Sequence, residues 1–218
     1  MSSTPNNAQN VSVAKPKVGG AIFVAPLGTD LPTDATTALD AAFQNVGYIS
    51  EDGVVNTNSP DTDTIKEWGG ASVGKIDNGK DDTWQFTMIE ALNLAALKLV
   101  YGPDNVSGTL EEGITVKANS NEQPDVSLVI DMILKGGALK RVVLPSAGVS
   151  EVGEVTYAAT SAIGYQTTLL ATPDAEGNTH YEYIKSAAAA ALAKTPAPAA
   201  AAEPDAGKED TAACIPDR

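Results

Sequence analysis

The sequence is short of the residues that most active sites require. Its 218 residues include one cysteine, Cys214, and one histidine, His180. A single cysteine rules out an intrachain disulfide and a cysteine-based metal cage. One histidine leaves most zinc and hydrolase sites without their usual ligands and bases. Basic residues are also few, since 14 Lys and Arg face 28 Asp and Glu, a net charge of −14 at pH 7. Phosphate binding needs clustered Lys and Arg, so this balance argues against a nucleic-acid-binding protein.

Long apolar segments are missing as well. The chain has no run of about 18 apolar residues that could span a membrane. Its first ten residues, MSSTPNNAQN, lack the basic and apolar regions of a secretory signal. The Asn-x-Ser sequences at Asn10 and Asn105 are therefore interpreted as chance matches. We expect a protein that is made in a cytoplasm and stays there until something releases it.

Composition divides the chain into three regions. Residues 1–17 are polar and predict a flexible N-terminal arm. Residues 18–185 form the body, which holds most of the large apolar side chains. Residues 186–218 are an Ala/Pro-rich acidic tail, in which residues 187–194 favour two helical turns before the prolines stop any helix. The tail holds 3 basic and 5 acidic residues, a net −2, so arm and body carry −12 of the −14.

Short strands dominate the body. Residues 83–89 alternate cleanly, with Trp84, Phe86 and Met88 on one face and threonines and a glutamine on the other, which predicts a half-buried strand. Turns rich in Gly, Pro, Asn and Asp separate such runs. This pattern indicates a mainly β fold, a sandwich or a barrel. Further strands are expected at residues 20–27, 46–50, 54–56, 126–134, 141–144, 154–158, 167–172 and 181–184.

Two helices and one long loop interrupt the strands. Residues 33–43 have apolar side chains at helical spacing after Pro32. Residues 91–101 carry one apolar stripe, with Asn93 as a candidate cap and Gly102-Pro103 at the end. Residues 50–82 form the longest stretch without a clear apolar strand. A loop of that length in a compact domain is usually functional or ordered by a partner.

The search for chemistry finds no catalytic residue, metal site or cofactor site, and predicts that the protein is not an enzyme. His180 follows a turn and is interpreted as an edge-strand residue rather than a general base. No nucleophile elbow, Walker A loop or Rossmann fingerprint occurs. A ladder of Asn and Asp side chains after residue 55 resembles a calcium-binding loop, but Pro60 and Asp61 occupy positions that need a ligand and a glycine.

Three segments resemble the major tail protein of long-tailed bacteriophages, the subunit of the tail tube. They are VGGAIFVAPLG from residue 18, PTDATTALDAAFQNVGYISEDGV from residue 32, and DDTWQFTMIEALNLAALKLVYG from residue 81. The resemblance lies in the order of elements and in two phrases. The first is a strand, a short helix and the turn GYISEDG. The second is a strand with alternating aromatic residues that leads into a helix ending at Tyr101-Gly102.

The resemblance implies two packed antiparallel sheets, a sandwich or barrel-like fold, with one flanking α-helix and a long loop. Six subunits would form a ring, and stacked rings would form a virion tube made in the host bacterial cytoplasm. A tape measure protein would fill the lumen during assembly, terminator and tip proteins would close the ends, and DNA would pass through without tight binding. In such a tube the loop 51–82, the arm before Val18 and segments after Lys185 would bridge subunits.

Two groups of residues are the candidates for these roles. Intersubunit contacts are expected in the long loop, whose large apolar side chains a solvated loop would not need. An acidic lumen wall is expected because carboxylates repel the DNA backbone. The loop candidates are Glu51, Asp52, Ile65 and Trp68. The lumen candidates are Asp81, Asp82, Glu151 and Glu154.

Two other functions stay open on the sequence alone. A tube or ring protein of a contractile injection or secretion machine would share the fold, with a sheath around its outer surface. A soluble β-sandwich binding module or enzyme would stay monomeric at every concentration. Electron microscopy of the purified protein separates the three hypotheses.

Overall fold

The structure, a computed structural model, describes residues 6–187. It is mainly β, with a nine-stranded antiparallel sheet, a two-stranded sheet and one α-helix in the part described. This confirms the fold class that the sequence predicts. No helix among the described residues is long and apolar enough to cross a membrane. The helix predicted for residues 187–194 lies, apart from Ala187, outside the described residues.

The elements follow one another in a simple order along the chain. The strands are β1 (Lys15–Pro16), β2 (Ile22–Pro26), β3 (Gln44–Asn45), β4 (Ile49–Lys66), β5 (Ser72–Met88), β6 (Val106–Ser107), β7 (Thr115–Val116), β8 (Val126–Ile133), β9 (Leu139–Val152), β10 (Tyr165–Thr172) and β11 (Tyr181–Lys185). The helices are α1 (Leu94–Tyr101) and three short 3₁₀ turns, η1 (Ala8–Asn10), η2 (Pro103–Asn105) and η3 (Lys135–Gly137).

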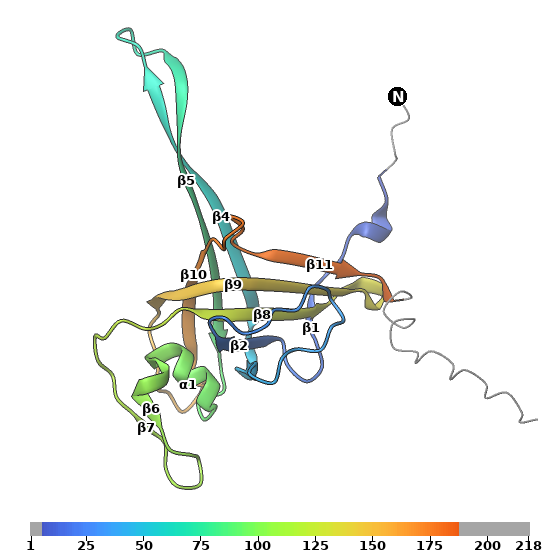
Figure 1. Cartoon of the computed structure of the whole chain (residues 1–218), viewed down its shortest axis with the longest axis vertical. Coiled ribbons are helices and arrows are strands. Elements are labelled where there is room, and N and C mark those ends of the chain that lie inside the picture. The colour runs from blue at the N-terminus through green and yellow to red at the C-terminus, as the bar shows by residue number, and fades with distance from the viewer. Residues whose placement is uncertain (1–5, 188–218) are drawn as a thin grey trace, which may run out of the picture.

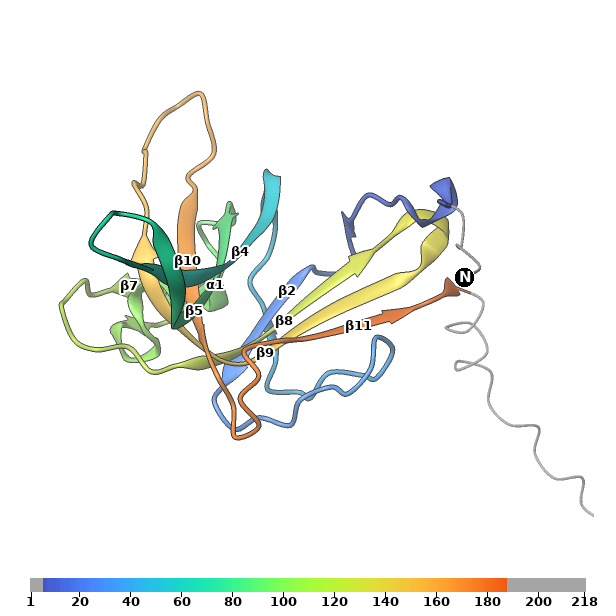
Figure 2. The same cartoon turned by 90° about the horizontal axis from the view of Figure 1, so that it is seen from above.

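The large sheet is bent into two halves that share β9. The strand order is β3-β2-β8-β9-β10-β5-β4, with β1 beside β8 and β11 beside β9. Register shifts interrupt the β8–β9 and β9–β10 pairs, and irregularities of this kind bend and twist a sheet. Figures 1 and 2 show β8, β9 and β11 running across the direction of β5 and β10. The two packed sheets implied by the resemblance are therefore two halves of one continuous sheet.

The main core lies between these two halves and is closed by α1. Alternation in β5 is as predicted, since Trp84, Phe86 and Met88 are buried at 5%, 2% and 0% exposure. They pack with residues of β8, β9, β10 and α1 in one cluster. The Asn93 side chain caps α1 by accepting hydrogen bonds from the backbone N–H of Ala95 and Ala96. The helix predicted for residues 91–101 is thus present, beginning at Leu94.

The helix predicted for residues 33–43 is wrong. In a helix the carbonyls of Asp34 and Thr37 would accept from backbone N–H groups four residues on. Here Arg141 Nη1 donates to both carbonyls, at 3.0 and 2.7 Å. The segment instead lies over the outer face of the sheet, where Leu39 and Phe43 pack on a second, smaller core. Their apolar spacing therefore comes from packing on a sheet.

The loop predicted for residues 50–82 is wrong in its local structure. It is a long β-hairpin, formed by β4 and most of β5. Its strands project into solvent and bury neither face, so the sequence shows no alternation there. The strand predicted for residues 154–158 is also wrong, because these residues leave the sheet after β9.

Candidate assembly surfaces

The β4–β5 hairpin is the most prominent feature of the molecule. Its strands pair from Val54↔Phe86 to Lys66↔Ser72, and every residue between Asn58 and Asp81 is exposed. At about 3.3 Å per residue, the strand from Asn58 to Lys66 reaches roughly 30 Å from the body. Figure 1 shows the hairpin pointing away from the rest of the chain. The arm buries none of its residues from Asn58 to Asp81 against its own subunit.

The tip of the hairpin presents an aromatic side chain to water. Gly70 N donates to Glu67 O and Glu67 N donates to Ala71 O, both at 2.9 Å, so Trp68-Gly69-Gly70 forms the loop. Gly70 takes the positive φ, 87°, that such a turn needs at its last position. Trp68 is fully exposed at 106%. Other apolar side chains nearby are also exposed, at Ile65, Val73 and Ile76. These exposed apolar side chains make the hairpin a candidate interaction surface.

A polar cluster fixes the base of the hairpin. Asp82 is completely buried and accepts hydrogen bonds from Asn56 Nδ2 at 2.7 Å and Thr179 Oγ1 at 2.6 Å. His180 Nδ1 lies 2.5 Å from the same carboxylate, and its ring meets Trp84 edge-on at 5.2 Å. Burial alone would raise the pKa of Asp82, but the hydrogen bonds from Thr179, His180 and Asn56 outweigh it and lower that pKa. The single histidine therefore anchors the β10–β11 turn to the hairpin.

The outer face of the β9–β10–β5–β4 half is mostly polar and carries a few acidic side chains. Gln85 Nε2 donates to Thr168 Oγ1 at 3.1 Å, and these two residues lie directly opposite each other. Glu151 lies opposite Thr168, which places the Glu151 side chain on this outer face. Asp81 precedes the buried Asp82, and because side chains alternate along a strand, Asp81 lies on the outer face as well. Glu154 is exposed just beyond β9. The face also carries Thr57, Thr83, Thr87 and Gln166, together with the apolar Val55 and Leu170, which lie opposite Gln85 and Thr83.

The sheet ends in strands with an open edge. Within residues 6–187, β4 pairs only with β5, and β11 pairs only with β9. The other edge of each strand leaves backbone N–H and C=O groups available to a strand of another chain. Natural monomers usually protect such edges, whereas assemblies use them.

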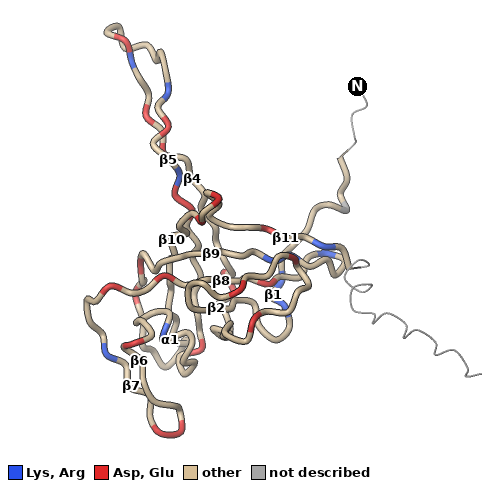
Figure 3. Tube along the Cα trace, viewed as in Figure 1, with Lys and Arg blue, Asp and Glu red and all other residues tan. Residues whose placement is uncertain are grey.

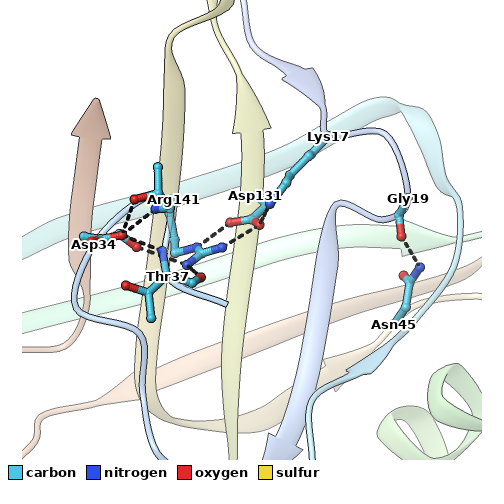
Figure 4. A network of polar contacts seen from close by, with 8 residues as sticks. Lys17, Gly19, Asp34, Thr37, Asn45, Asp131 and Arg141 are labelled. Carbon is cyan, nitrogen blue, oxygen red and sulfur yellow. Dashed lines mark hydrogen bonds and ion pairs between the residues drawn. The ribbon is translucent and has the colours of Figure 1, made fainter. Parts of the chain in front are cut away.

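A buried ion network ties the N-terminal arm to the body (Figure 4). Arg141 is 2% exposed and binds Asp131 with two nitrogens, at 2.6 and 2.8 Å. Lys17 Nζ, from the chain just after β1, reaches the same carboxylate at 2.7 Å. Burial would raise the pKa of Asp131, but Arg141 and then Lys17 lower it by hydrogen bonding and charge. The arm therefore has a fixed attachment point beside β8.

Comparison with known protein families identifies the fold. A family model described as phage tail tube protein matches residues 4–194. The chain belongs to the phage tail tube protein family. This confirms the resemblance that the three sequence segments indicate. No curated protein matches the chain.

Two solved structures are similar to this tail tube protein at low identity. The tube-terminating cap of the anti-feeding prophage is 12% identical, with a TM-score of 0.36, and the match covers 79% of this chain and 94% of the cap. The sheath–tube complex of PVC, an extracellular contractile injection system, in its extended state contains a chain that is 11% identical, with a TM-score of 0.35. That match covers 77% of this chain and 90% of the other.

The tail tube hairpin separates the four loop candidates into two groups. Ile65 and Trp68 lie near its tip, whereas Glu51 and Asp52 lie beside the body, where the β4–β5 register shifts between Ile49 and Val54. Sequence reasoning missed Val73 and Ile76, although both are large apolar residues in the same polar stretch. It also missed the threonine and glutamine face, for which the alternation in β5 was an available signal.

Three of the four acidic candidates of the tail tube protein are exposed on or beside the polar face, and one is not. Asp82 points into the protein and is held by three side chains. It cannot line a lumen, because strand alternation puts it on the same face as buried Trp84. Among the described residues, no group of three or more His, Cys, Asp or Glu is arranged to hold a metal ion.

Proposed function

We propose that this protein is a structural, non-enzymatic subunit that assembles with itself into stacked hexameric rings to form the phage tail tube. The tube is the conduit for DNA during ejection into the host. The observation that carries the proposal is the hairpin, an exposed arm with Trp68 at its tip, in a chain of the tail tube family. Only a neighbouring molecule can cover these apolar side chains.

Rings close by pairing the open sheet edges of adjacent subunits. The available edge of β4 supplies unpaired backbone groups along its length, and a strand of the neighbour satisfies them. A head-to-tail contact of this kind closes into a ring when the rotation per subunit divides a full turn. The hairpin then extends beyond the ring and contacts the ring that stacks on it.

The polar face of the β9–β10–β5–β4 half lines the lumen. Its threonine and glutamine side chains offer no cation to displace DNA counterions. Asp81, Glu151 and Glu154 add negative charge at or beside this wall, and Asp82 contributes none. The same surface meets the tape measure protein during assembly. Terminator and tip proteins bind the rings at the two ends.

Shortening the hairpin tests the assembly role. Replacement of residues 59–81 by Asn-Gly keeps the base pair Asn58↔Asp82 and removes the arm. We expect purified wild-type protein to form tubes in negative-stain images and the shortened protein to stay as monomers or isolated rings. Thr62→Ala with Thr64→Ala is the matched control, since it alters the stem without shortening it. Normal tubes from the shortened protein would contradict the role of the hairpin, and the absence of tubes from wild type would contradict the proposed function.

A further inference from the structure

A hollow on the body has the chemistry to receive an aromatic side chain. It has a volume of about 440 Å³ and lies between the segment before β3, the β10–β11 turn and β11. Leu31, Val143, Tyr181 and Tyr183 form its apolar wall, and Asp174, Ala175 and Glu176 lie at the β10–β11 turn. We call it the tyrosine hollow. Its volume lies in the range of sites that hold small ligands, about 300–1,000 Å³.

The tyrosine wall is held in place from within the subunit. The rings of Tyr181 and Tyr183 are stacked, 6.4 Å apart and 4° from parallel. Tyr181 Oη donates to Asp174 Oδ2 at 2.6 Å, which ties the wall to the turn. Val143 at the back is 1% exposed and belongs to the smaller core. The hollow therefore exists before any partner arrives.

We infer that Trp68 at the hairpin tip of one subunit enters the tyrosine hollow of another subunit. This rests on the proposed function, because it specifies one contact between stacked copies. The hairpin ladder holds Trp68 away from its own body, so the two sites meet only between chains (Figure 1). Trp and Tyr dominate the energies of protein interfaces, where an anchor enters a preformed pocket.

Charge favours the same pairing. Residues 65–75 hold Lys66, Lys75 and one acidic residue, Glu67, so the hairpin end is net positive in a chain of net charge −14. Neither lysine forms an ion pair within residues 6–187. The turn beside the hollow offers Asp174 and Glu176, which likewise have no cationic partner there. Figure 3 shows basic positions on both strands of the upper part of the hairpin.

A charge swap tests this contact without disturbing the fold. Lys66 and Glu176 are both exposed. We expect Lys66→Glu and Glu176→Lys each to raise the protein concentration needed for tube formation about two- to five-fold, the scale of an exposed ion pair. The double variant should recover most of the loss, because it restores the pair in the opposite sense. A double variant whose loss of assembly equals the sum of the two single losses would overturn the inference.

The aromatic anchor gives a larger effect. Trp68→Ala should raise the required concentration about 30-fold, the scale of an interface hot spot. Ala175→Trp, which fills the hollow from an exposed position, should do the same. Combining the two should cost no more than either alone. Leu110→Ala is the matched control, since Leu110 is 63% exposed on the loop between β6 and β7.

Cross-linking locates the contact directly. Ala71→Cys and Ala175→Cys are placed in a Cys214→Ser background, which keeps Trp68 and leaves two thiols per chain. A short dithiol-reactive linker added to assembled tubes should give a ladder of linked chains, and Leu110→Cys in place of Ala175→Cys should give none. Tubes that form normally without a 71–175 ladder overturn this inference alone. A chain that never forms tubes overturns the proposed function and this inference with it.

Discussion

Arg141 is a buried charged residue that links two separate parts of the fold. It is buried, charged and divided between Asp131 on β8 and two carbonyls of the segment over the sheet. Removing one partner of a buried ion pair leaves the other charge without compensation. Arg141→Met should therefore lower the free energy of unfolding by about 3–5 kcal/mol. Urea unfolding of the monomer measures this loss.

The matched variant separates charge from packing. Arg141→Met combined with Asp131→Leu removes both charges, and we expect it to recover much of the lost stability. A double variant as unstable as Arg141→Met alone would show that the carbonyl contacts at Asp34 and Thr37, rather than the ion pair, account for the effect.

Asp82 makes the stability of the folded protein depend on pH in the acidic range. Its pKa is lowered in the folded state, so its contribution to stability is present above the unfolded pKa, about 3.9, and is lost as pH falls through the folded value. Asp82→Asn should have a smaller loss of stability between about pH 5 and pH 2 than wild type. Thermal unfolding at a series of pH values measures the slope. Asp61→Asn, an exposed residue of the hairpin, should keep the wild-type slope.

At the scale of elements, the hairpin is separate from the stability of the body. Every residue from 59 to 81 is exposed, so their removal takes away little buried surface. The Asn-Gly shortened protein should unfold within about 1 kcal/mol of wild type. Calorimetry of the monomer gives this value. A loss several times larger would mean that the arm supports the Asp82 cluster at its base.

How far the elements follow from sequence depends on what each one packs against. The strand at Trp84, Phe86 and Met88 and the helix after Asn93 are predictable because one face of each is buried. The hairpin has no buried face, and its local composition resembles a loop. The segment 33–43 has helical spacing but lies against a sheet through Arg141, a residue about 100 positions away in the chain. Local patterns contain no information on such a contact.

The candidate site also contains parts that the sequence predicts and parts that it does not. The alternation that predicts Trp84 as buried also places Asp82 on that face, so its burial could be predicted from the sequence. The tip turn at Trp68 could be located by its two glycines. The tyrosine hollow could not, because its walls come from the segment before β3, from β9, from the β10–β11 turn and from β11, which only the folded chain brings together.

At the scale of the whole molecule, the acidic wall can be tested by charge reversal. Glu151→Lys with Glu154→Lys should leave tubes intact and slow DNA release from assembled tails. Two unit charges about 4 Å apart interact by only about 1 kcal/mol in water, but rings repeat each contact many times. Salt shortens the reach of charges to about 8–10 Å, so high salt should restore the rate. Release is followed with a DNA-binding dye.

The control for that experiment carries the same charge change elsewhere. Glu111→Lys with Glu112→Lys alters the exposed loop between β6 and β7, away from the polar face. It should release DNA at the wild-type rate. Equal slowing by both pairs would mean that overall charge, rather than the wall, governs release, and no slowing by either would show that the wall has no part in transport.

The two-stranded build of the hairpin also has a mechanical consequence. A pull on the tip along the strands is carried by the covalent backbones of both strands, which the hydrogen bonds from Val54↔Phe86 to Lys66↔Ser72 hold side by side. A force perpendicular to the two-stranded hairpin is resisted only by a single layer of backbone. A filament whose rings are joined by such arms resists stretching along its axis but bends readily, because each arm is stiff along its strands and flexible across them. Any tubes that the shortened protein forms would break more easily between rings, while the circular shape of each ring would be kept.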